Sequence, residues 1–360
     1  MVLLRNISLY QFRNYRQATF SFEKPVTCIC GKNGSGKTNL LDAVYTLCYT
    51  KSYFSASVAP TVMNGTEGYR IQASFSENAE KQHIVSCKYL NGKKEISCGG
   101  LIYEKLSDHI GRHAAVMIAP DDIELINDGS ELRRKFVDGM LSQCNRDYLN
   151  ALIDYQRALQ QRNAWLKQYA RGAAQGNDML AYFDDVLDKS GSYLFACRRE
   201  WVNGFAPFLQ EYYALLSGGS EQVGLVYESD LHREPLKQLL ERSLSEDFRY
   251  QRTMRGVHRD DLQLLMNGQP IKSYGSQGQK KSFLFALKLA QYGFLKKQMH
   301  QNPILLLDDV FEKLDQQRME SLLRIIRSAD FGQVILTDTH EERIRKAFSG
   351  NETELGIIRL

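Results

Sequence analysis

The sequence predicts an α/β protein: a head with a mixed sheet and an antiparallel β-subdomain, interrupted by a second, mostly helical lobe. Three observations lead to this prediction: strand-like apolar runs at the start, helical spacing through the middle, and alternating helices and strands at the end. The 360 residues correspond to two domains at about 150 residues each. We therefore expect a head formed by residues 1–118 and 255–360, and an inserted helical lobe formed by residues 119–254.

The elements are expected in the following order. Strand-like runs (LLRNISLY, QATFSF, VTCIC and IQASF) are interrupted by one helix, and HIVSCKYL continues to a turn at Asn91-Gly92. Apolar residues then recur at helical steps from Glu131 to Lys167, and helices continue from Met179 to about Leu216. A further helix near Glu234–Arg242, β-structure at DLQLLMNGQPI and a final helix–strand–helix–strand segment from Gln279 complete the chain.

The composition is that of a folded globular protein, with 43% hydrophobic and 24% charged residues. No apolar run approaches the roughly 18 residues that span a bilayer, and the N-terminus is too polar for a signal peptide, so we expect a cytoplasmic protein without a membrane partner. The seven cysteines form no C-x-x-C pair, so neither disulfides nor a zinc site is indicated. Any metal is expected to arrive with a bound ligand.

One segment matches a phosphate-binding loop, G-x-x-x-x-G-K-[ST]. It follows the apolar run VTCIC and precedes a helical sequence, and it consists of Gly31, Lys32, Asn33, Gly34, Ser35, Gly36, Lys37 and Thr38. Glycines let backbone N–H groups turn toward phosphates, and the helix N-terminus favours negative charge. Lys37 is expected to reach the β/γ oxygens of a nucleotide, ATP, and Thr38 to offer its hydroxyl to Mg²⁺.

A second segment supplies acidic groups. The apolar strand ILLL ends in Asp308 and Asp309, and two adjacent carboxylates at the end of a buried strand seldom serve packing. We expect Asp308 to hold Mg²⁺ through water and Asp309 to orient or deprotonate the attacking water. The predicted catalytic residues are therefore Lys37, Asp308 and Asp309, and the predicted metal ligands are Thr38 and Asp308. Asp309 is one methylene shorter than a glutamate base, so we expect slow turnover.

A third segment, Ser273-Tyr274-Gly275-Ser276-Gln277-Gly278-Gln279, immediately precedes a long helical run. In isolation S-x-G-Q most often forms an N-capping turn. Because it lies one helix ahead of the acidic strand, we interpret it as a second anion nest for a γ-phosphate. The chain's own loop already surrounds its nucleotide, so this nest is expected to contact the nucleotide of another protomer in an ATP-sandwich homodimer.

Together these motifs resemble the heads of ABC-type ATPases of the SMC/Rad50 kind, and in detail the RecF family. The resemblance covers nearly the whole chain and includes FRNY, GKNGSGKTNLLDAVYTL, APDDIELINDG, RRKFVDGMLSQ, YQRALQQRNAWLK, HRDDL, SYGSQGQKKS and LLLDDVFEKLD. It implies that Arg13 lies near the nucleotide, that Asp315 belongs to a loop communicating between protomers, and that Ser276, Gly278 and Gln279 act in trans.

The resemblance also implies a function. ATP would close a dimer on DNA at single-strand gaps or single-strand/double-strand junctions, and slow hydrolysis would release it. Expected partners are DNA, a second copy of the chain, a RecR-like protein and the recombinase machinery, in DNA replication, repair and the SOS response. The alternatives are another SMC/Rad50-like ATPase outside the RecF family, or a transporter-type ATPase subunit.

Some positions depart from the family pattern. Val257 stands where a proline commonly precedes HRDD, and KSYFSAS replaces a stretch that usually contains arginine. The switch residue after the last predicted strand is either Thr339 or His340.

Basic clusters that could contact DNA phosphates contain Arg133, Arg134 and Lys135, then Arg198 and Arg199, and then Arg249, Arg252, Arg255 and Arg259. A net charge of +4 is weak support for DNA binding, and for each cluster alone a solvated helix face is the commoner explanation.

Overall fold

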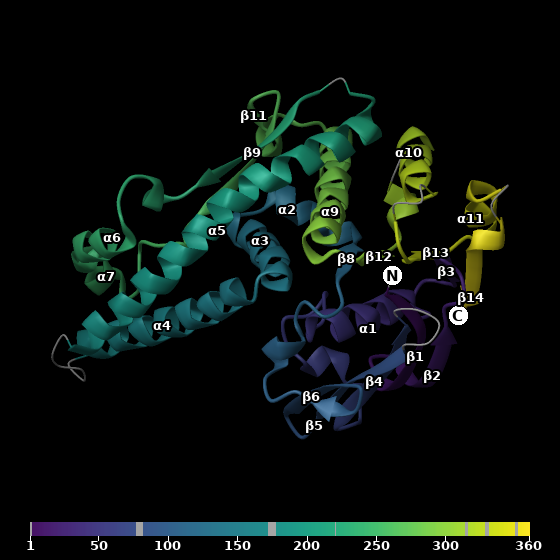
Figure 1. Cartoon of the computed structure of the whole chain (residues 1–360), viewed down its shortest axis with the longest axis horizontal. Helices are drawn as coiled ribbons and strands as arrows, with labels where there is room; N and C mark the ends of the chain where they lie inside the picture. The colour runs from purple at the N-terminus through teal and green to yellow at the C-terminus, as the bar shows by residue number, and fades with distance from the viewer. Residues whose placement is uncertain are drawn as a thin grey trace. The chain divides into compact units, whose positions relative to one another are not determined.

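The computed structural model describes residues 2–76, 82–171, 178–219, 221–313, 316–327, 331–349 and 352–360 (Figure 1). The chain divides into two compact units. Unit 1 contains Met1–Ile123, Tyr212–Gly219 and Lys281–Leu360, and unit 2 contains Glu124–Glu211 and Ser220–Lys280. Two of the four boundaries fall inside long helices, α5 (Asp178–Ser217) and α9 (Gln277–Met299). No described helix combines the length and apolarity needed to cross a membrane.

Unit 1 contains a five-stranded sheet in the order β14-β3-β13-β12-β8. All four of its pairings are parallel, so this described sheet is parallel and not mixed as predicted. Its strands are β3 (Val26–Cys30), β8 (Ala115–Ile118), β12 (Ile304–Leu307), β13 (Val334–Asp338) and β14 (Leu355–Arg359). Every residue of β3, β8, β12 and β13 is buried, which explains their nearly continuous apolar sequences. The Sγ atoms of Cys28 and Cys30 lie 3.3 Å apart on one face of β3.

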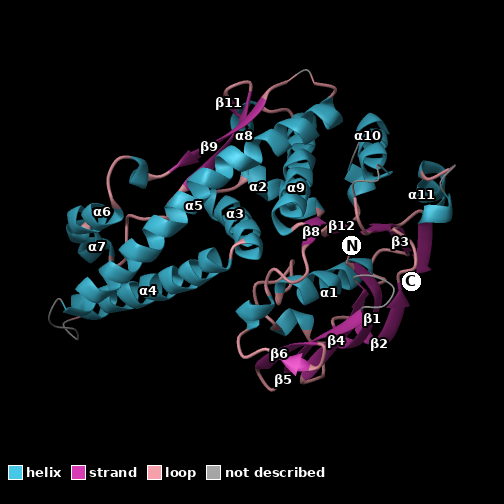
Figure 2. Ribbon diagram, in the orientation of Figure 1, coloured by secondary structure: helices cyan, strands magenta, loops and turns pink. Residues whose placement is uncertain are grey.

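The other sheet of unit 1 is antiparallel, with six strands in the order β2-β1-β4-β5-β6-β7 (Figure 2). Its strands are β1 (Leu3–Phe12), β2 (Tyr15–Ser21), β4 (Gly68–Ser76), β5 (Gln82–Leu90), β6 (Lys93–Cys98) and β7 (Leu101–Ile102). The predicted turn at Asn91-Gly92 is confirmed: Leu90 pairs with Lys93, and the turn residues have φ of 50° and 78°. Positive φ at both central positions suits Asn-Gly and matches the twist of the hairpin.

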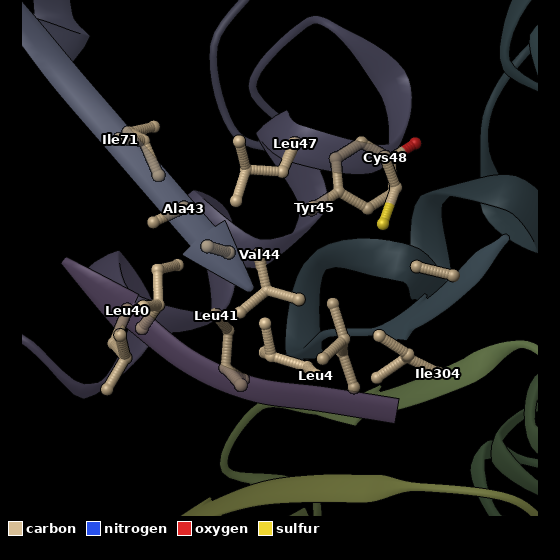
Figure 3. Packing of buried hydrophobic residues seen from close by; sticks show 14 of the residues in the cluster. Leu4, Leu40, Leu41, Ala43, Val44, Tyr45, Leu47, Cys48, Ile71 and Ile304 are labelled. Atoms are coloured by element: carbon tan, nitrogen blue, oxygen red, sulfur yellow. The ribbon is translucent and has the colours of Figure 1, made fainter. Parts of the chain in front are cut away.

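Helix α1 (Lys37–Tyr49) packs into a hydrophobic core of unit 1, which contains residues from both sheets (Figure 3). Leu40, Leu41 and Val44 are buried there together with Leu4 of β1 and Ile304 of β12. Each such side chain contributes about 1.5–3 kcal/mol on burial. The core therefore holds the first turn of α1 in place relative to the strands that precede and follow it.

The C-terminal part of unit 1 contains more elements than the sequence predicted. After α9 and β12 come α10 (Gln316–Arg327), β13, α11 (Glu341–Ala347) and β14. The sequence predicts only two helices and two strands between Gln279 and Leu360, so α11 and β14 are additional elements. A seven-residue helix shows little periodicity. Within the described residues β14 is an edge strand that pairs with β3 alone, and it is partly buried, so neither element leaves a strong sequence pattern.

Unit 2 is mostly helical. Its elements are α2 (Glu124–Asn127), α3 (Ser130–Cys144), α4 (Arg146–Ala170), most of α5, α6 (Leu236–Arg242), α7 (Leu244–Tyr250), α8 (Ile271–Tyr274) and a sheet of β9 (Val223–Glu228), β10 (Asp261–Met266) and β11 (Gln269–Pro270). The helical spacing from Glu131 to Lys167 is divided between α3 and α4 at Asn145, whose side chain accepts a hydrogen bond from the Tyr148 N–H at 2.9 Å.

Residues 255–280 belong to unit 2, whereas the sequence-based division grouped them with the head. The reason is strand pairing: β10 forms an antiparallel pair with β9 over six residues, from Asp261 opposite Glu228 to Met266 opposite Val223. An antiparallel partner that lies before β10 in the sequence cannot be identified from the apolar pattern of β10 alone.

Candidate nucleotide-binding site

The loop between β3 and α1 requires glycine at defined positions. Gly34 and Gly36 have φ of 82° and 112°, in the left-handed region that side chains disfavour. A Cβ atom on Gly36 would also lie 2.7 Å from Nδ2 of Asn14 and 2.9 Å from the hydroxyl of Tyr15. Packing and backbone conformation thus both exclude a side chain at Gly36, where the loop enters the helix.

The ammonium group of Lys37 lies inside this loop. It donates hydrogen bonds to the carbonyl oxygens of Gly31 at 2.9 Å and Lys32 at 3.2 Å, and the residue is 4% exposed. Within the described part of the chain, the buried hydroxyl of Ser35 has no hydrogen-bond partner. The first N–H groups of α1 also lack acceptors within the helix. The loop therefore presents a cation, a hydroxyl and a helix N-terminus, which suit a phosphate group.

Thr38 and Asp308 are in direct contact. The Thr38 hydroxyl donates to the two carboxylate oxygens of Asp308 at 2.9 and 3.0 Å. The Thr337 hydroxyl on β13 donates to Oδ1 of the same carboxylate at 2.9 Å. Burial raises the pKa of Asp308, and the hydrogen bonds from both threonines oppose that shift. These oxygen atoms form a small hard-ligand cluster beside the loop, of the kind that Mg²⁺ prefers.

Asp309 follows in a left-handed conformation with φ of 44°. Its N–H donates to the Thr337 hydroxyl at 2.8 Å, and its side chain is partly exposed. Thr337 thus positions both acidic residues, although the sequence analysis did not select it. The available signal was a lone hydroxyl in the buried strand VILTD, and its importance depends on β13 lying beside β12 in the parallel sheet.

Arg13 was expected near the nucleotide, and its side chain forms an ion pair with an acidic residue on α1. Its guanidinium donates to Oδ2 of Asp42 at 2.9 and 2.5 Å and to the Ser52 hydroxyl at 3.0 Å. Asp42 is fully buried and also accepts from the Tyr53 N–H at 2.7 Å. Ser52 and Tyr53 of the KSYFSAS segment, together with Arg13, therefore hold the Asp42 side chain of α1 in place.

The two residues after Arg13 contact the phosphate-binding loop itself. The Asn14 amide donates to the carbonyl of Ser35 at 3.2 Å, and the Tyr15 hydroxyl donates to the carbonyl of Gly36 at 3.1 Å. Within the FRNY motif, the family resemblance assigns a site role to Arg13 alone. The structure shows that its asparagine and tyrosine are the residues that support the loop.

The two switch candidates differ in exposure. His340 is exposed and precedes α11, and its N–H donates to the buried carboxylate of Asp338 at 2.6 Å. Arg343 pairs with the same carboxylate at 2.7 Å. Thr339, which lies between Asp338 and His340 in sequence, is partly buried. The choice between Thr339 and His340 stays a prediction.

The segment before α9 forms a reciprocal capping box. The Ser276 N–H donates to Oε1 of Gln279 at 2.7 Å, and the Gln279 N–H donates to the Ser276 hydroxyl at 3.2 Å. The Gln279 amide also donates to Glu221 at 2.5 Å. Ser276 is exposed and Gly278 is partly buried, so the capped helix end lies at the surface of unit 2. Asp315 lies outside the described residues.

Two of the basic residues considered as phosphate contacts are buried in ion pairs. Arg133 is bidentate to Asp261, at 2.8 and 2.9 Å, and Arg198 donates to Asp138 at 2.8 Å and to the carbonyl of Val257 at 2.8 Å. Their side chains are 11% and 4% exposed. Both arginines therefore hold unit 2 together around the HRDD segment.

The fold and this site define a P-loop ATPase head of the ABC type. The sequence model described as "RecF/RecN/SMC N terminal domain" matches residues 3–358. A DNA replication and repair protein RecF from Flavobacterium johnsoniae is 42% identical over 340 residues, covering 94% of this chain and 95% of its own. The RecF of Cytophaga hutchinsonii is 40% identical over 355 residues, covering 99% and 94%. The chain belongs to the RecF family of DNA replication and repair proteins.

Solved structures agree with this assignment. The recombination mediator protein RecF bound to ATPrS, in the RecFOR pathway, superimposes with a TM-score of 0.87 at 28% identity, over 94% of this chain and 93% of that one. An Smc head domain from Pyrococcus furiosus gives a TM-score of 0.55 at 15% identity over 96% and 91%, which supports the fold. The RecF resemblance and the ABC-type head predicted from the motifs are thus confirmed.

Proposed function

We propose that the chain is an ATP-dependent DNA-binding protein of recombinational repair and replication-fork maintenance. ATP binding joins two copies around DNA, and slow hydrolysis separates them. The observation that carries this proposal is the contact of Thr38 with Asp308, which joins the phosphate-binding loop to the acidic strand. A nucleotide in the loop is thereby next to the groups needed to hydrolyse it.

The residues present fit ATP and Mg²⁺. The loop from Gly31 to Thr38 offers a buried hydroxyl and an internal ammonium for phosphate oxygens, and no room for a side chain on Gly36. Thr38 and Asp308 would hold Mg²⁺, which when bound neutralises charge on the phosphates. Asp309 is proposed to orient the attacking water and accept its proton. The RecF structures bound to ATP and ATPrS support the choice of nucleotide.

The proposed homodimer uses the exposed N-terminus of α9. In the capping box, Ser276 and Gln279 satisfy each other's N–H groups and make the turn rigid. A rigid turn with Gly278 at the helix start offers further N–H groups to a γ-phosphate bound by the partner. Such trans contacts exist only in the ATP-bound dimer, so they give ATP the differential affinity that a switch requires.

DNA is proposed to bind through phosphate contacts without base readout, at single-strand gaps or single-strand/double-strand junctions. Such contacts provide affinity and strong salt dependence. The solved relatives are described as recombination mediator proteins of the RecFOR pathway. This description supports a RecR-like partner and a role in recombinase loading for the present chain.

Analytical ultracentrifugation tests the proposal. The wild type, Ser276→Arg and Ser192→Arg are compared with and without Mg²⁺-ATP and a gapped DNA. Ser192 is exposed on α5 and provides a charge-matched control. We expect ATP to dimerise the wild type and Ser192→Arg but not Ser276→Arg, and only the dimers to retain DNA. An ATP-bound wild type that stays monomeric while still binding DNA would overturn the switch mechanism.

A further inference from the structure

Three metal-ligating side chains meet in unit 1, away from the nucleotide-binding loop. They are His83 on β5, Cys98 at the end of β6, and His113 before β8, and their ligand atoms all lie within 4.8 Å of one another. Among the described residues this is the one group of three or more His, Cys, Asp and Glu side chains close enough to share a metal ion.

Sheet register brings the first two ligands to one face. His83 lies opposite Phe75, and Cys98 lies opposite Val85. His83 and Val85 are two residues apart on β5 and so point to the same side, the side on which Phe75 and Val85 are fully buried. The hairpin therefore places an imidazole and a thiol together.

His113 is held in position by an aromatic stack. Its ring lies on that of Phe75 with centroids 4.2 Å apart and an interplanar angle of 12°. Its Nε2 atom lies 3.1 Å from Nε2 of His83. Two nitrogen ligands of a tetrahedral Zn²⁺ ion, each about 2.0–2.1 Å from the metal, are about 3.3 Å apart. The pair of imidazoles is thus already close to the spacing that zinc requires.

Cys98 can adjust to complete the site. It is partly exposed and is followed by Gly99 and Gly100, which have positive φ and no atoms near their Cβ positions. The Tyr103 hydroxyl interacts with the thiol, and the Arg112 guanidinium lies over the Tyr103 ring, 5.9 Å from its centroid.

We propose that His83, Cys98 and His113 form a Zn²⁺ site that joins the β5–β6 hairpin to the start of β8. Two imidazoles and a thiolate suit a borderline-soft metal and do not suit Mg²⁺ or Ca²⁺. The three ligands leave a fourth position for water at the partly exposed side of His83 and Cys98. The ligands are spaced too widely in sequence to form a recognisable motif, which is why the sequence indicated no zinc site.

Cobalt substitution tests this proposal on the full chain, stripped of metal by a chelator and kept in excess Mg²⁺. We expect one Co²⁺ per chain, with a near-ultraviolet thiolate-to-cobalt charge-transfer band that Zn²⁺ abolishes. Cys98→Ser should remove the band, and His83→Asn should weaken binding at least about 10-fold. The Mg²⁺ cluster at Asp308 contains no thiol and cannot produce this signal.

Matched controls separate the site from general effects. Cys197→Ser changes another partly exposed cysteine, and His300→Asn changes an exposed histidine with φ of 52° that asparagine tolerates. Both should keep the band. Zn²⁺ should also raise the melting temperature of the wild type but not of Cys98→Ser. A wild type without the band, or a band that persists in Cys98→Ser, would overturn the proposal.

Discussion

The hydroxyl of Thr38 lies within hydrogen-bond distance of both carboxylate oxygens of Asp308, 270 residues further along the chain. One residue lies in the first turn of α1 and the other follows β12, so their contact exists only because β3, β13 and β12 are neighbours in the parallel sheet. Thr337 on the intervening strand β13 donates to the same carboxylate at 2.9 Å. The proposed Mg²⁺ site is therefore a product of strand order.

Replacing Thr38 by valine should lower Mg²⁺-dependent ATP hydrolysis at least about 10-fold, because the shape is kept while an oxygen ligand is lost. Phosphate release at several Mg²⁺ concentrations measures this effect. Thr46→Val is the matched control on the same helix, since the buried Thr46 hydroxyl has no hydrogen-bond partner within the described residues. Equal losses in the two variants would contradict the role given to Thr38.

Asp309→Asn should reduce hydrolysis by about 100-fold or more while ATP-induced dimerisation is retained, because the amide cannot accept a proton from water. Asparagine tolerates the left-handed backbone at this position, φ of 44°, so the fold should be unaffected. Phosphate release and sedimentation on the same samples measure both properties. Unchanged hydrolysis would remove Asp309 from the proposed mechanism.

Arg162→Met should destabilise the chain by about 3–5 kcal/mol, because it leaves a buried carboxylate without its partner. Arg162 is fully buried and pairs with Asp184 and Asp247, each at 2.6 Å. Urea unfolding measures the change, and adding Asp247→Asn should recover part of it. Arg255→Met, which breaks an exposed pair with Asp230, should change stability by less than about 1 kcal/mol.

The stability of the chain should fall as the pH drops from about 6.5 toward 4, in part through His258. Burial lowers the pKa of this imidazole from 6.5 to about 4, so the unfolded chain takes up a proton in this range and the folded chain does not. The ring contacts the Tyr155 hydroxyl at 2.7 Å and the Thr253 carbonyl at 3.1 Å, and Arg134, Arg162 and Arg259 also disfavour its protonation.

At pH 5 the loss attributable to His258 is about 2 kcal/mol relative to pH 7. Urea unfolding of the wild type and His258→Gln across this range isolates it, because other titrating groups contribute equally to both proteins. His258→Gln is expected to show the shallower pH dependence. Parallel pH profiles would show that His258 titrates alike in the folded and unfolded chains.

Much of the fold and site follows from local sequence. A phosphate-binding loop consists of consecutive residues, so its glycines, Lys37 and Thr38 are recognisable without tertiary information. Buried parallel strands such as VTCIC and ILLL are continuous apolar runs, and the Asn91-Gly92 turn reflects a local backbone requirement. These patterns can be recognised in the sequence because each physical constraint acts on residues that are neighbours in the chain.

Tertiary structure decided which distant side chains meet. Thr337 reaches Asp308 because β13 lies beside β12, Arg133 and Arg198 are buried in ion pairs, and His83 reaches His113 through sheet register and an aromatic stack. Contacts of this kind depend on strand order and helix packing, which fix distances between residues far apart in sequence. The sequence alone determined the family and the phosphate-binding loop, whereas the fold determined how each polar group is partnered.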